Sequence, residues 1–192
     1  MGTSVFFPRE KDGNKIKLVY HGRLDKHRGL PVVVELARLL HTQSDKFEFY
    51  FHGEGDYKNT LISSKIPNIH VTGNLVRSDI ARRLGGYDIG LLPMPDQKIW
   101  RIASPLKRSE YLASGLVVLG INHQGNSFEE SHSFMKLFSQ EKFLSQSMDW
   151  LMNIESKNLR KLQTESQIFA ERELQWKTSI QNLNDLIFEI TA

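Results

Sequence analysis

Cysteine is absent from the 192-residue sequence, which excludes disulfide bonds and thiolate metal ligands. No apolar run approaches the roughly 20 residues that a membrane-spanning helix needs, and the N-terminus has no hydrophobic signal-peptide core. Internal repeats and low-complexity tracts are also missing, so a repeat architecture is not expected. These absences predict a cytoplasmic protein.

An excess of charge of one sign is lacking as well. The sequence has 25 Lys and Arg residues against 22 Asp and Glu residues, and the net charge of +3 is spread along the chain. This charge is too small to predict a nucleic-acid-binding face, although a local anion site stays open. With 40% hydrophobic and 24% charged residues, the composition is that of an ordinary globular domain.

Several familiar site motifs are missing. The Gly-Glu-Gly at 53–55 lacks the third glycine of a dinucleotide fingerprint, since Lys58 occupies that place, and there is no phosphate loop or Gly-x-Ser-x-Gly elbow. The histidines lack the paired helical spacing of a zinc site, so we predict no metal. Each histidine is predicted to be structural or on the surface, but His21, His52 and His70 end strands, where one could line a site.

Short apolar runs alternate with helical patterns from Lys15 onward. The runs are continuously apolar, as in parallel strands that are buried on both faces. We therefore predict an α/β fold, with a Rossmann-like doubly wound parallel sheet and C-terminal helices in a single domain over residues 15–192. The predicted strands are 16–20, 47–51, 69–72, 87–92 and 116–119, with 134–138 as a candidate sixth, and the predicted helices are 29–40, 57–64, 77–84 capped by Ser78, 104–115, 141–152, 156–173 and 178–190.

Residues 1–14 have a different character. They mix Gly, Pro, Lys and Asp around two adjacent phenylalanines without any period. This composition predicts a tail or linker, with ordered structure from about Lys15.

The helix with the clearest boundaries runs from Ser104 to Gly115. Ser104 can serve as N-cap, Pro105 suits the first helical position, and Gly115 can end the helix in the left-handed conformation. Lys107 lies in the first turn, where the helix dipole disfavours a cation by about 0.3–1 kcal/mol, and Glu110 lies beside the apolar stripe. Either an anion and a sugar hydroxyl bind here, or these two residues form a surface ion pair.

Four loops follow predicted strands and should meet at one edge, because ligands in such folds bind at the carboxyl ends of the strands. The first loop, 22–29, contains two arginines and a lysine and precedes a helix, which suits phosphate oxygens. A solvated basic loop is the alternative. The other loops contain Gly53, Gly73 and the segment 93–107. We expect them to form one composite site.

Taken together, these segments resemble the C-terminal, nucleotide-sugar-binding domain of retaining glycosyltransferases of family 4, also called group 1, which have the GT-B fold. The resemblance covers about residues 17–120. It is carried by Gly-Arg-Leu at 22–24, Gly-Glu-Gly at 53–55, Val-Thr-Gly at 71–73, Tyr-Asp-Ile-Gly-Leu-Leu-Pro at 87–93 and Ser-Pro-Leu-Lys-x-x-Glu-Tyr-Leu-Ala-Ser-Gly at 104–115. Gln-Trp-Lys at 175–177 is similar to the segment before the family's last helix.

The resemblance implies a role for each segment. Arg23, Arg28 and Lys107 would bind the donor's diphosphate and stabilise it as it departs, with Arg28 in the place of the usual lysine. Glu110 would bind the ribose hydroxyls. Four further residues would frame the base of the donor: Gly53, Gly73, Asn74 and Leu75. The start of the predicted helix would bind the distal phosphate through Ser104, Pro105 and Leu106. Gly22 is also implied as a donor-binding residue.

One position departs from the family pattern. The family usually has two glutamates separated by seven residues, and Ile102 occupies the place of the first. That glutamate normally contacts the donor sugar, so the identity of the sugar and the activity itself are in question. Asp96 and Gln97 of the same loop are candidate replacements.

The resemblance implies the donor-binding half of a metal-independent transferase without a cofactor. Its partners would be a nucleotide sugar, a glycan, lipid-linked or polysaccharide acceptor, and an N-terminal acceptor-binding domain, without which we expect no transfer. The full-length protein could lie peripherally on the inner face of a membrane. Two alternatives are a nucleotide-sugar epimerase of the same fold, for which we find no catalytic acid or base, and a non-catalytic binding module, which Ile102 favours.

Overall fold

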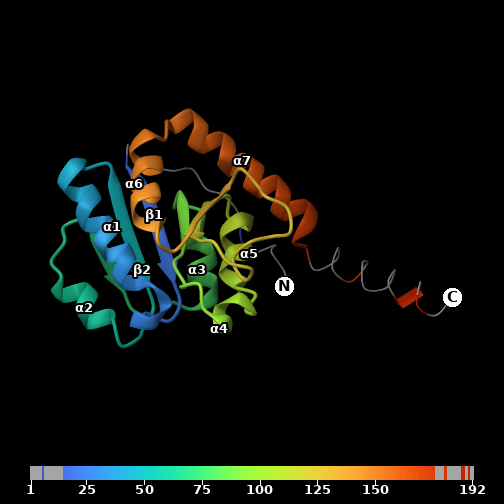
Figure 1. The fold of residues 1–192 in the computed structure, drawn as a ribbon, viewed down its shortest axis with the longest axis horizontal. Coiled ribbons are helices and arrows are strands. Elements are labelled where there is room, and N and C mark those ends of the chain that lie inside the picture. Colours follow the sequence, from blue (N-terminus) through green and yellow to red (C-terminus); the bar gives the residue numbers. More distant parts are fainter. Residues whose placement is uncertain (1–5, 7–14, 176–179, 181–186, 189, 191–192) are drawn as a thin grey trace.

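A computed structural model describes Phe6, residues 15–175 and the single positions 180, 187, 188 and 190. The described chain forms a six-stranded sheet in the order β3-β2-β1-β4-β5-β6, with helices on both faces (Figure 1). Every neighbouring pair of strands is parallel. The predicted doubly wound α/β fold is confirmed, including its sixth strand.

The predicted elements follow the chain in the predicted order and differ from the predictions mainly at their ends, whereas two short helices within predicted loops were not predicted. In chain order, the elements are β1 (Ile16–His21), the short 3-10 helix η2 (Lys26–Arg28), α1 (Leu30–Gln43), β2 (Phe47–His52), α2 (Lys58–Ser63), β3 (Ile69–Thr72), α3 (Arg77–Leu84), β4 (Ile89–Leu92), α4 (Lys98–Arg101), α5 (Leu106–Ala113), β5 (Val117–Ile121), β6 (Met135–Phe138), α6 (Phe143–Asn153) and α7 (Ser156–Glu173). The predicted helix at 178–190 falls almost entirely outside the described residues, as does Trp176.

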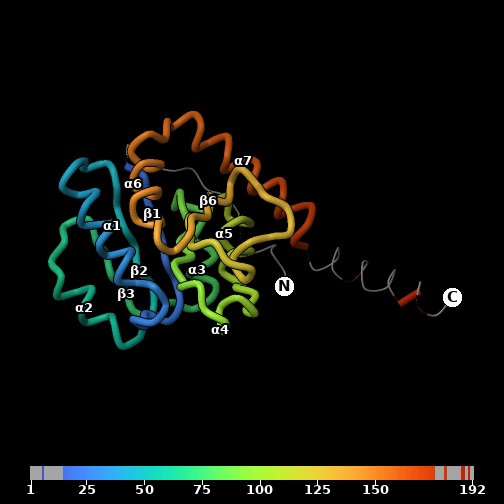
Figure 2. Tube along the Cα trace, in the orientation of Figure 1, coloured from blue at the N-terminus to red at the C-terminus, as the bar shows by residue number. Residues whose placement is uncertain are grey.

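Side chains of the central strands alternate between two hydrophobic clusters, one on each face of the sheet. In β1, Leu18 and Tyr20 pack with α1 and α6, whereas Val19 packs with α3 and α5 on the opposite face. Figure 2 shows α1 and α2 on one side of β1 and α3 and α5 on the other. Burial on both faces explains why the strands read as continuous apolar runs.

The last long helix, α7, reaches both clusters. Leu159 belongs to the cluster with α1 and α6, and Ala170 belongs to the cluster with α3 and α5. Between them, Gln163 Nε2 donates hydrogen bonds to the backbone oxygen of Asp88 at 3.3 Å and to its Oδ1 at 3.1 Å. Because Asp88 directly precedes β4, this contact anchors α7 at the amino ends of the strands, opposite the predicted site. Within the described residues, no helix is both long enough and apolar enough to cross a bilayer.

Two predicted helix caps are wrong. The N-cap of α5 is Pro105 and not Ser104, because Pro105 keeps an extended backbone with ψ of 113° and the helix begins only after it. The N-cap of α3 is Val76, whose ψ is 155°, so that Ser78 lies inside the helix. Gly115 does adopt the left-handed conformation, with φ of 70°, as predicted.

Phe6 belongs to the core although it lies in the predicted tail. Its side chain is only 5% exposed and packs in the cluster with α3 and α5. The guanidinium of Arg77 lies 5.9 Å from the centre of its ring. Burial of an aromatic side chain is favourable enough to hold a single residue of a polar segment against the domain.

Asn126 joins the ends of β4 and β5. Its side chain is fully buried, and Nδ2 donates to the backbone oxygens of Leu92 at 3.2 Å and Ile121 at 2.9 Å. We expect Asn126→Ala to lower the free energy of unfolding by about 2 kcal/mol, because both buried oxygens lose a donor. Urea denaturation measures this, with the exposed Asn122→Ala as control. Equal effects of the two substitutions would contradict the assignment.

Candidate functional site

The loops after β1, β2 and β3 lie side by side because backbone hydrogen bonds continue beyond the strands. The N–H of Gly22 donates to the oxygen of His52 at 2.8 Å, and the N–H of Gly53 donates to the oxygen of Thr72 at 3.0 Å. The carboxyl ends of these strands therefore form one continuous edge, as the sequence predicts.

Glycines allow the loops and α5 to approach one another closely. Gly53 has φ of 149°, and a Cβ there would lie 1.8 Å from the backbone oxygen of Gly22. A Cβ on Gly22 would in turn lie 2.9 Å from Cε and 3.2 Å from Nζ of Lys107. The predicted lysine of α5 thus lies directly over the loop that follows β1.

The two predicted arginines converge on Asp25, a residue that the sequence analysis missed. Arg23 contacts the Asp25 carboxylate through Nε at 3.1 Å and Nη2 at 3.2 Å, and Arg28 Nε lies 3.4 Å from Oδ2. Hydrogen bonds from Arg23 hold the pKa of Asp25 below its ordinary value. Asp25 is only 5% exposed, whereas the Arg23 side chain is 67% exposed. The carboxylate is fixed, and one arginine extends from it into solvent.

A short helix lies within the loop predicted to follow β4. This helix, α4, places Trp100 against the basic loop, where the Arg28 guanidinium lies 5.0 Å from the ring centre. The ring of His27 stacks on Trp100, with 6.0 Å between ring centres and an angle of 16°. Arg28 is therefore held both by a carboxylate and by an aromatic face.

Lys107 is a half-buried cation in the first turn of α5. Its Nζ lies 5.4 Å from the ring centre of Tyr20. Burial lowers the pKa of Lys107, and the positive charge of Arg28 lowers it further. The ammonium of Lys107 is repelled by Arg28 and would be stabilised by a bound anion.

Glu110 lies against His21 and does not form the surface ion pair with Lys107 that we considered as an alternative. Its Oε2 is 3.2 Å from Nε2 of His21, and both side chains are only 12% exposed. Burial alone would raise the pKa of Glu110, but His21, Arg77 and Lys107 together lower it below its ordinary value. The carboxylate is thus kept ionised inside the edge of the site. His21 is the strand-end histidine that lines the site.

The remaining predicted residues surround this cluster. Gly73 adjoins the second loop, because a Cβ on it would lie 2.9 Å from Oε1 of Glu54. Asn74 is exposed and Leu75 packs partly against the cluster with α3 and α5. Ser104 and Leu106 are exposed at the start of α5, and Pro105 is partly exposed between them.

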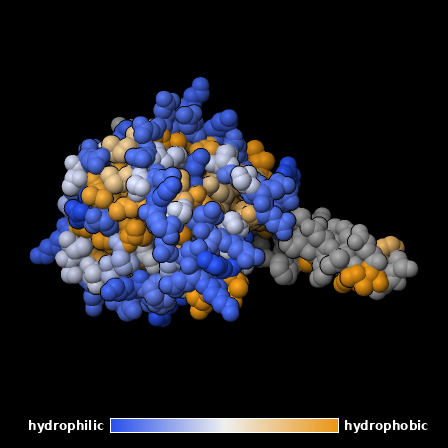
Figure 3. All heavy atoms as spheres, viewed as in Figure 1, coloured by the Kyte–Doolittle hydropathy of each residue, from blue (hydrophilic) through white to orange (hydrophobic). Residues whose placement is uncertain are grey.

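Ile102 ends α4 and is 78% exposed. The Asp96 carboxylate, one of the candidate replacements for the missing glutamate, is bound by Arg101 at 2.6 Å and 3.0 Å. Gln97, the other candidate, is the N-cap of α4. Figure 3 shows a hydrophobic patch where Figure 1 places α4, in a surface that is otherwise mainly hydrophilic there. The position of the missing glutamate therefore carries an exposed aliphatic side chain beside a charged pair.

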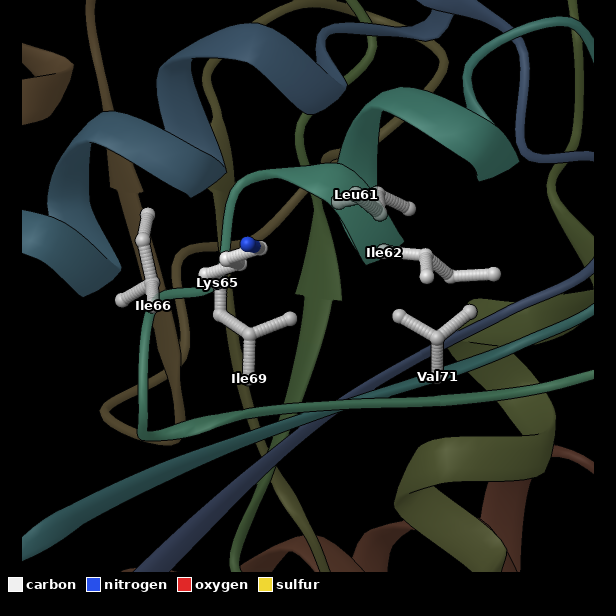
Figure 4. Close-up of a pocket in the computed structure, with 6 residues that line it drawn as sticks. All are labelled: Leu61, Ile62, Lys65, Ile66, Ile69 and Val71. Atoms are coloured by element: carbon white, nitrogen blue, oxygen red, sulfur yellow. The ribbon is translucent and has the colours of Figure 1, made fainter.

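A separate hollow lies between α2 and β3 (Figure 4). Its lining is aliphatic apart from one lysine, and consists of Leu61, Ile62, Lys65, Ile66, Ile69 and Val71. None of the predicted site residues lines it, and its apolar walls are unsuited to a diphosphate. The hollow is therefore not part of the candidate site.

Comparisons with known proteins agree with this architecture. A family model described as "Glycosyl transferases group 1" matches residues 15–151. No curated protein sequence matches the chain. Solved structures show its fold in proteins of low sequence identity. The structure of the GtfA/B complex aligns with a TM-score of 0.77 at 14% identity and covers 97% of this chain.

Two further structures are informative. The C-terminal domain of a group 1 family glycosyl transferase (LpcC) from Francisella tularensis has a TM-score of 0.72 at 15% identity, with 92% of this chain and 99% of that chain covered. The pneumococcal O-GlcNAc transferase GtfA, solved in complex with UDP and GlcNAc, has a TM-score of 0.71 at 14% identity and covers 97% of this chain.

This chain spans only 38% of the aligned chain in both the GtfA/B complex and the pneumococcal GtfA structure. The match to the family model covers residues 15–151, which is more than half of this chain. The fold of this chain, with its six-stranded parallel sheet, agrees with those structures. The chain therefore belongs to the group 1 glycosyltransferase family and has the Rossmann-like fold of a GT-B domain.

Proposed function

We propose that this chain is the donor-binding half of a retaining, metal-independent glycosyltransferase. The observation that carries the proposal is the convergence of Arg23, Arg28 and Lys107 at the carboxyl edge of the sheet, beside the N-terminus of α5. Cations and free helix N–H groups are the partners that a diphosphate needs. The pneumococcal relative bound to UDP supports this reading.

The proposed chemistry relies on positioning and charge. When the bond between the sugar and the diphosphate breaks, negative charge grows on the departing diphosphate. Lys107, Arg23 and the N-terminus of α5 would stabilise that charge, while Glu110 holds the ribose. The substrate would be a nucleotide sugar, and the acceptor would be a glycan, a lipid-linked sugar or a polysaccharide. An N-terminal GT-B domain would bind the acceptor, and transfer would require it.

A second candidate function is a non-catalytic module that binds a nucleotide sugar. It is favoured by the exposed Ile102 at the position where the family usually has a glutamate, and by the engagement of Asp96 with Arg101. The two candidates share the same donor site and differ only in turnover. Binding experiments therefore test the feature that both require.

The proposal predicts that affinity rises with each phosphate of the ligand. Calorimetric titrations at low salt should compare the nucleoside, monophosphate and diphosphate of uridine, guanosine and adenosine. Arg23→Ala should weaken binding of the preferred diphosphate by about three- to tenfold and leave nucleoside binding unchanged, as expected for an exposed charged contact. Arg38→Ala is the matched control, since Arg38 pairs with Glu35 within α1. Absence of diphosphate binding, or equal losses in the two variants, would refute the proposed function.

A further inference from the structure

We infer that His21 is a positioning residue, which orients the Glu110 carboxylate toward the ribose hydroxyls and so makes the site selective for ribonucleotides over 2′-deoxyribonucleotides. The inference rests on the proposed function and adds to it a residue outside the segments that carry the family resemblance. It starts from one contact, that between His21 Nε2 and Glu110 Oε2 at 3.2 Å.

The His21 ring is itself fixed by α5. It packs edge to face on Tyr111, with 5.3 Å between ring centres and an angle of 89° between the planes. Its backbone N–H lies 3.4 Å from the Tyr111 hydroxyl oxygen, and the Tyr111 side chain is completely buried. His21 is also the last residue of β1, in register with His52 of β2. The imidazole is thus held by the core on one side and by the sheet on the other.

The Glu110 carboxylate needs such a partner. At 12% exposure it has lost most of its hydration, and a buried carboxylate without a hydrogen-bond donor is costly. Nε2 of His21 has no aligned hydrogen-bond partner among the described residues, so its 3.2 Å approach to Oε2 is a close polar contact that limits how the carboxylate can turn. A carboxylate that is restricted at one oxygen has a restricted direction for the other, which is the requirement for binding a ribose hydroxyl selectively.

The selectivity follows from the same geometry. A site built around a hydroxyl rejects the analogue that lacks it, because its own buried polar group is then left without a partner. If His21 fixes the carboxylate, loss of the imidazole lets the Glu110 side chain turn. The preference for the ribonucleotide should then fall while the contacts to the diphosphate remain.

The experiment measures a ratio of affinities. Calorimetry on the 192-residue chain compares UDP, GDP and ADP with dUDP, dGDP and dADP, and the best-binding pair is carried forward. We expect the wild-type protein to prefer the ribonucleotide by about tenfold, as for one hydrogen bond to a charged group. His21→Phe keeps an aromatic ring against Tyr111 and should reduce this preference to about twofold or less. His21→Gln retains a donor and should recover a large part of it.

A purely structural role of His21 would lower both affinities equally and leave their ratio unchanged, and that result overturns the inference. In the double variant His21→Phe/Glu110→Gln, the ratio of affinities should be no lower than in Glu110→Gln alone, because the two residues act together.

Should His21→Phe fail to fold, nitrogen NMR of the wild-type imidazole tests the inference instead. The His21 ring signals should shift more with the ribonucleotide than with the deoxyribonucleotide, and equal shifts refute the inference. If diphosphate binding depends on Arg23 but the ratio does not depend on His21, only this inference fails; if no diphosphate binds, the proposed function fails with it.

Discussion

Replacing Lys107 with methionine is expected to weaken nucleoside diphosphate binding by about ten- to hundredfold, while the folded protein becomes slightly more stable. The affinity falls because a hydrogen bond to a charged group contributes about 1.5–3 kcal/mol, and the Lys107 ammonium lies over the loop that follows β1. Methionine has a similar length and fills the same half-buried space. Calorimetry with the preferred diphosphate measures the loss.

The gain in stability follows from the lowered pKa of Lys107, which results from burial and from Arg28. A lysine with a lower pKa in the folded state than in the unfolded state destabilises the fold while it is protonated in both. The wild-type protein should therefore gain stability as the pH rises from that lowered pKa toward the ordinary value of 10.5, and Lys107→Met should lack this gain.

Urea denaturation at neutral and alkaline pH measures this difference. Lys161→Met is the control, because Lys161 is exposed on α7 and lies 3.9 Å from Glu165. An unchanged affinity in Lys107→Met would remove this residue from the proposed site. A loss of both affinity and stability would show that Lys107 has a structural role instead.

Gly53→Ala is expected to lower the free energy of unfolding by about 3 kcal/mol or more. The φ of 149° strains any residue with a side chain, and the new Cβ would lie 1.8 Å from the backbone oxygen of Gly22. The backbone of Gly22 cannot move away at low cost. Its N–H donates a hydrogen bond to the backbone oxygen of His52, and the side chain of Lys107 lies beside it. The substitution should separate the first two loops of the site.

Urea denaturation also measures this effect, with Gly86→Ala as the matched control. A Cβ on Gly86, in the turn between α3 and β4, would lie 3.4 Å from the backbone oxygen of Arg83, which is an ordinary contact. We expect Gly86→Ala to change the free energy of unfolding by less than about 1 kcal/mol. Similar losses in both variants would show that the close approach of the loops is not the cause.

Much of the fold was predictable because burial leaves a local signal in the sequence. Each central strand packs on both faces, so its apolar run is continuous and its identity does not depend on distant residues. Helix starts were less predictable, since the start of α5 depends on the extended ψ of Pro105 and not on the presence of a serine. The single turn of α4 is shorter than the period that would reveal a helix.

The candidate site was predictable only in part. Cationic loops at strand ends can be identified from residue order, and the structure brings Arg23, Arg28 and Lys107 together at one edge. Their partners could not be assigned in the same way. The arrangement of both arginines on Asp25 depends on the 3-10 helix η2, which begins after Asp25 and contains Arg28. The contact of His21 with Glu110 joins residues from β1 and α5 that no spacing rule relates.

Asp25 and Glu110 also change how the site acts at a distance. Their two negative charges leave a net charge of +1 on the five side chains, so from beyond a Debye length of about 8 Å this cluster is only weakly positive. An approaching anion is then only weakly steered toward this cluster, and the cluster should add little to the dependence of the association rate on ionic strength. Phosphate ions and nucleic acids would therefore be attracted only weakly at long range. A ligand would gain binding energy from the three cations only when it fits between the loops and contacts them directly.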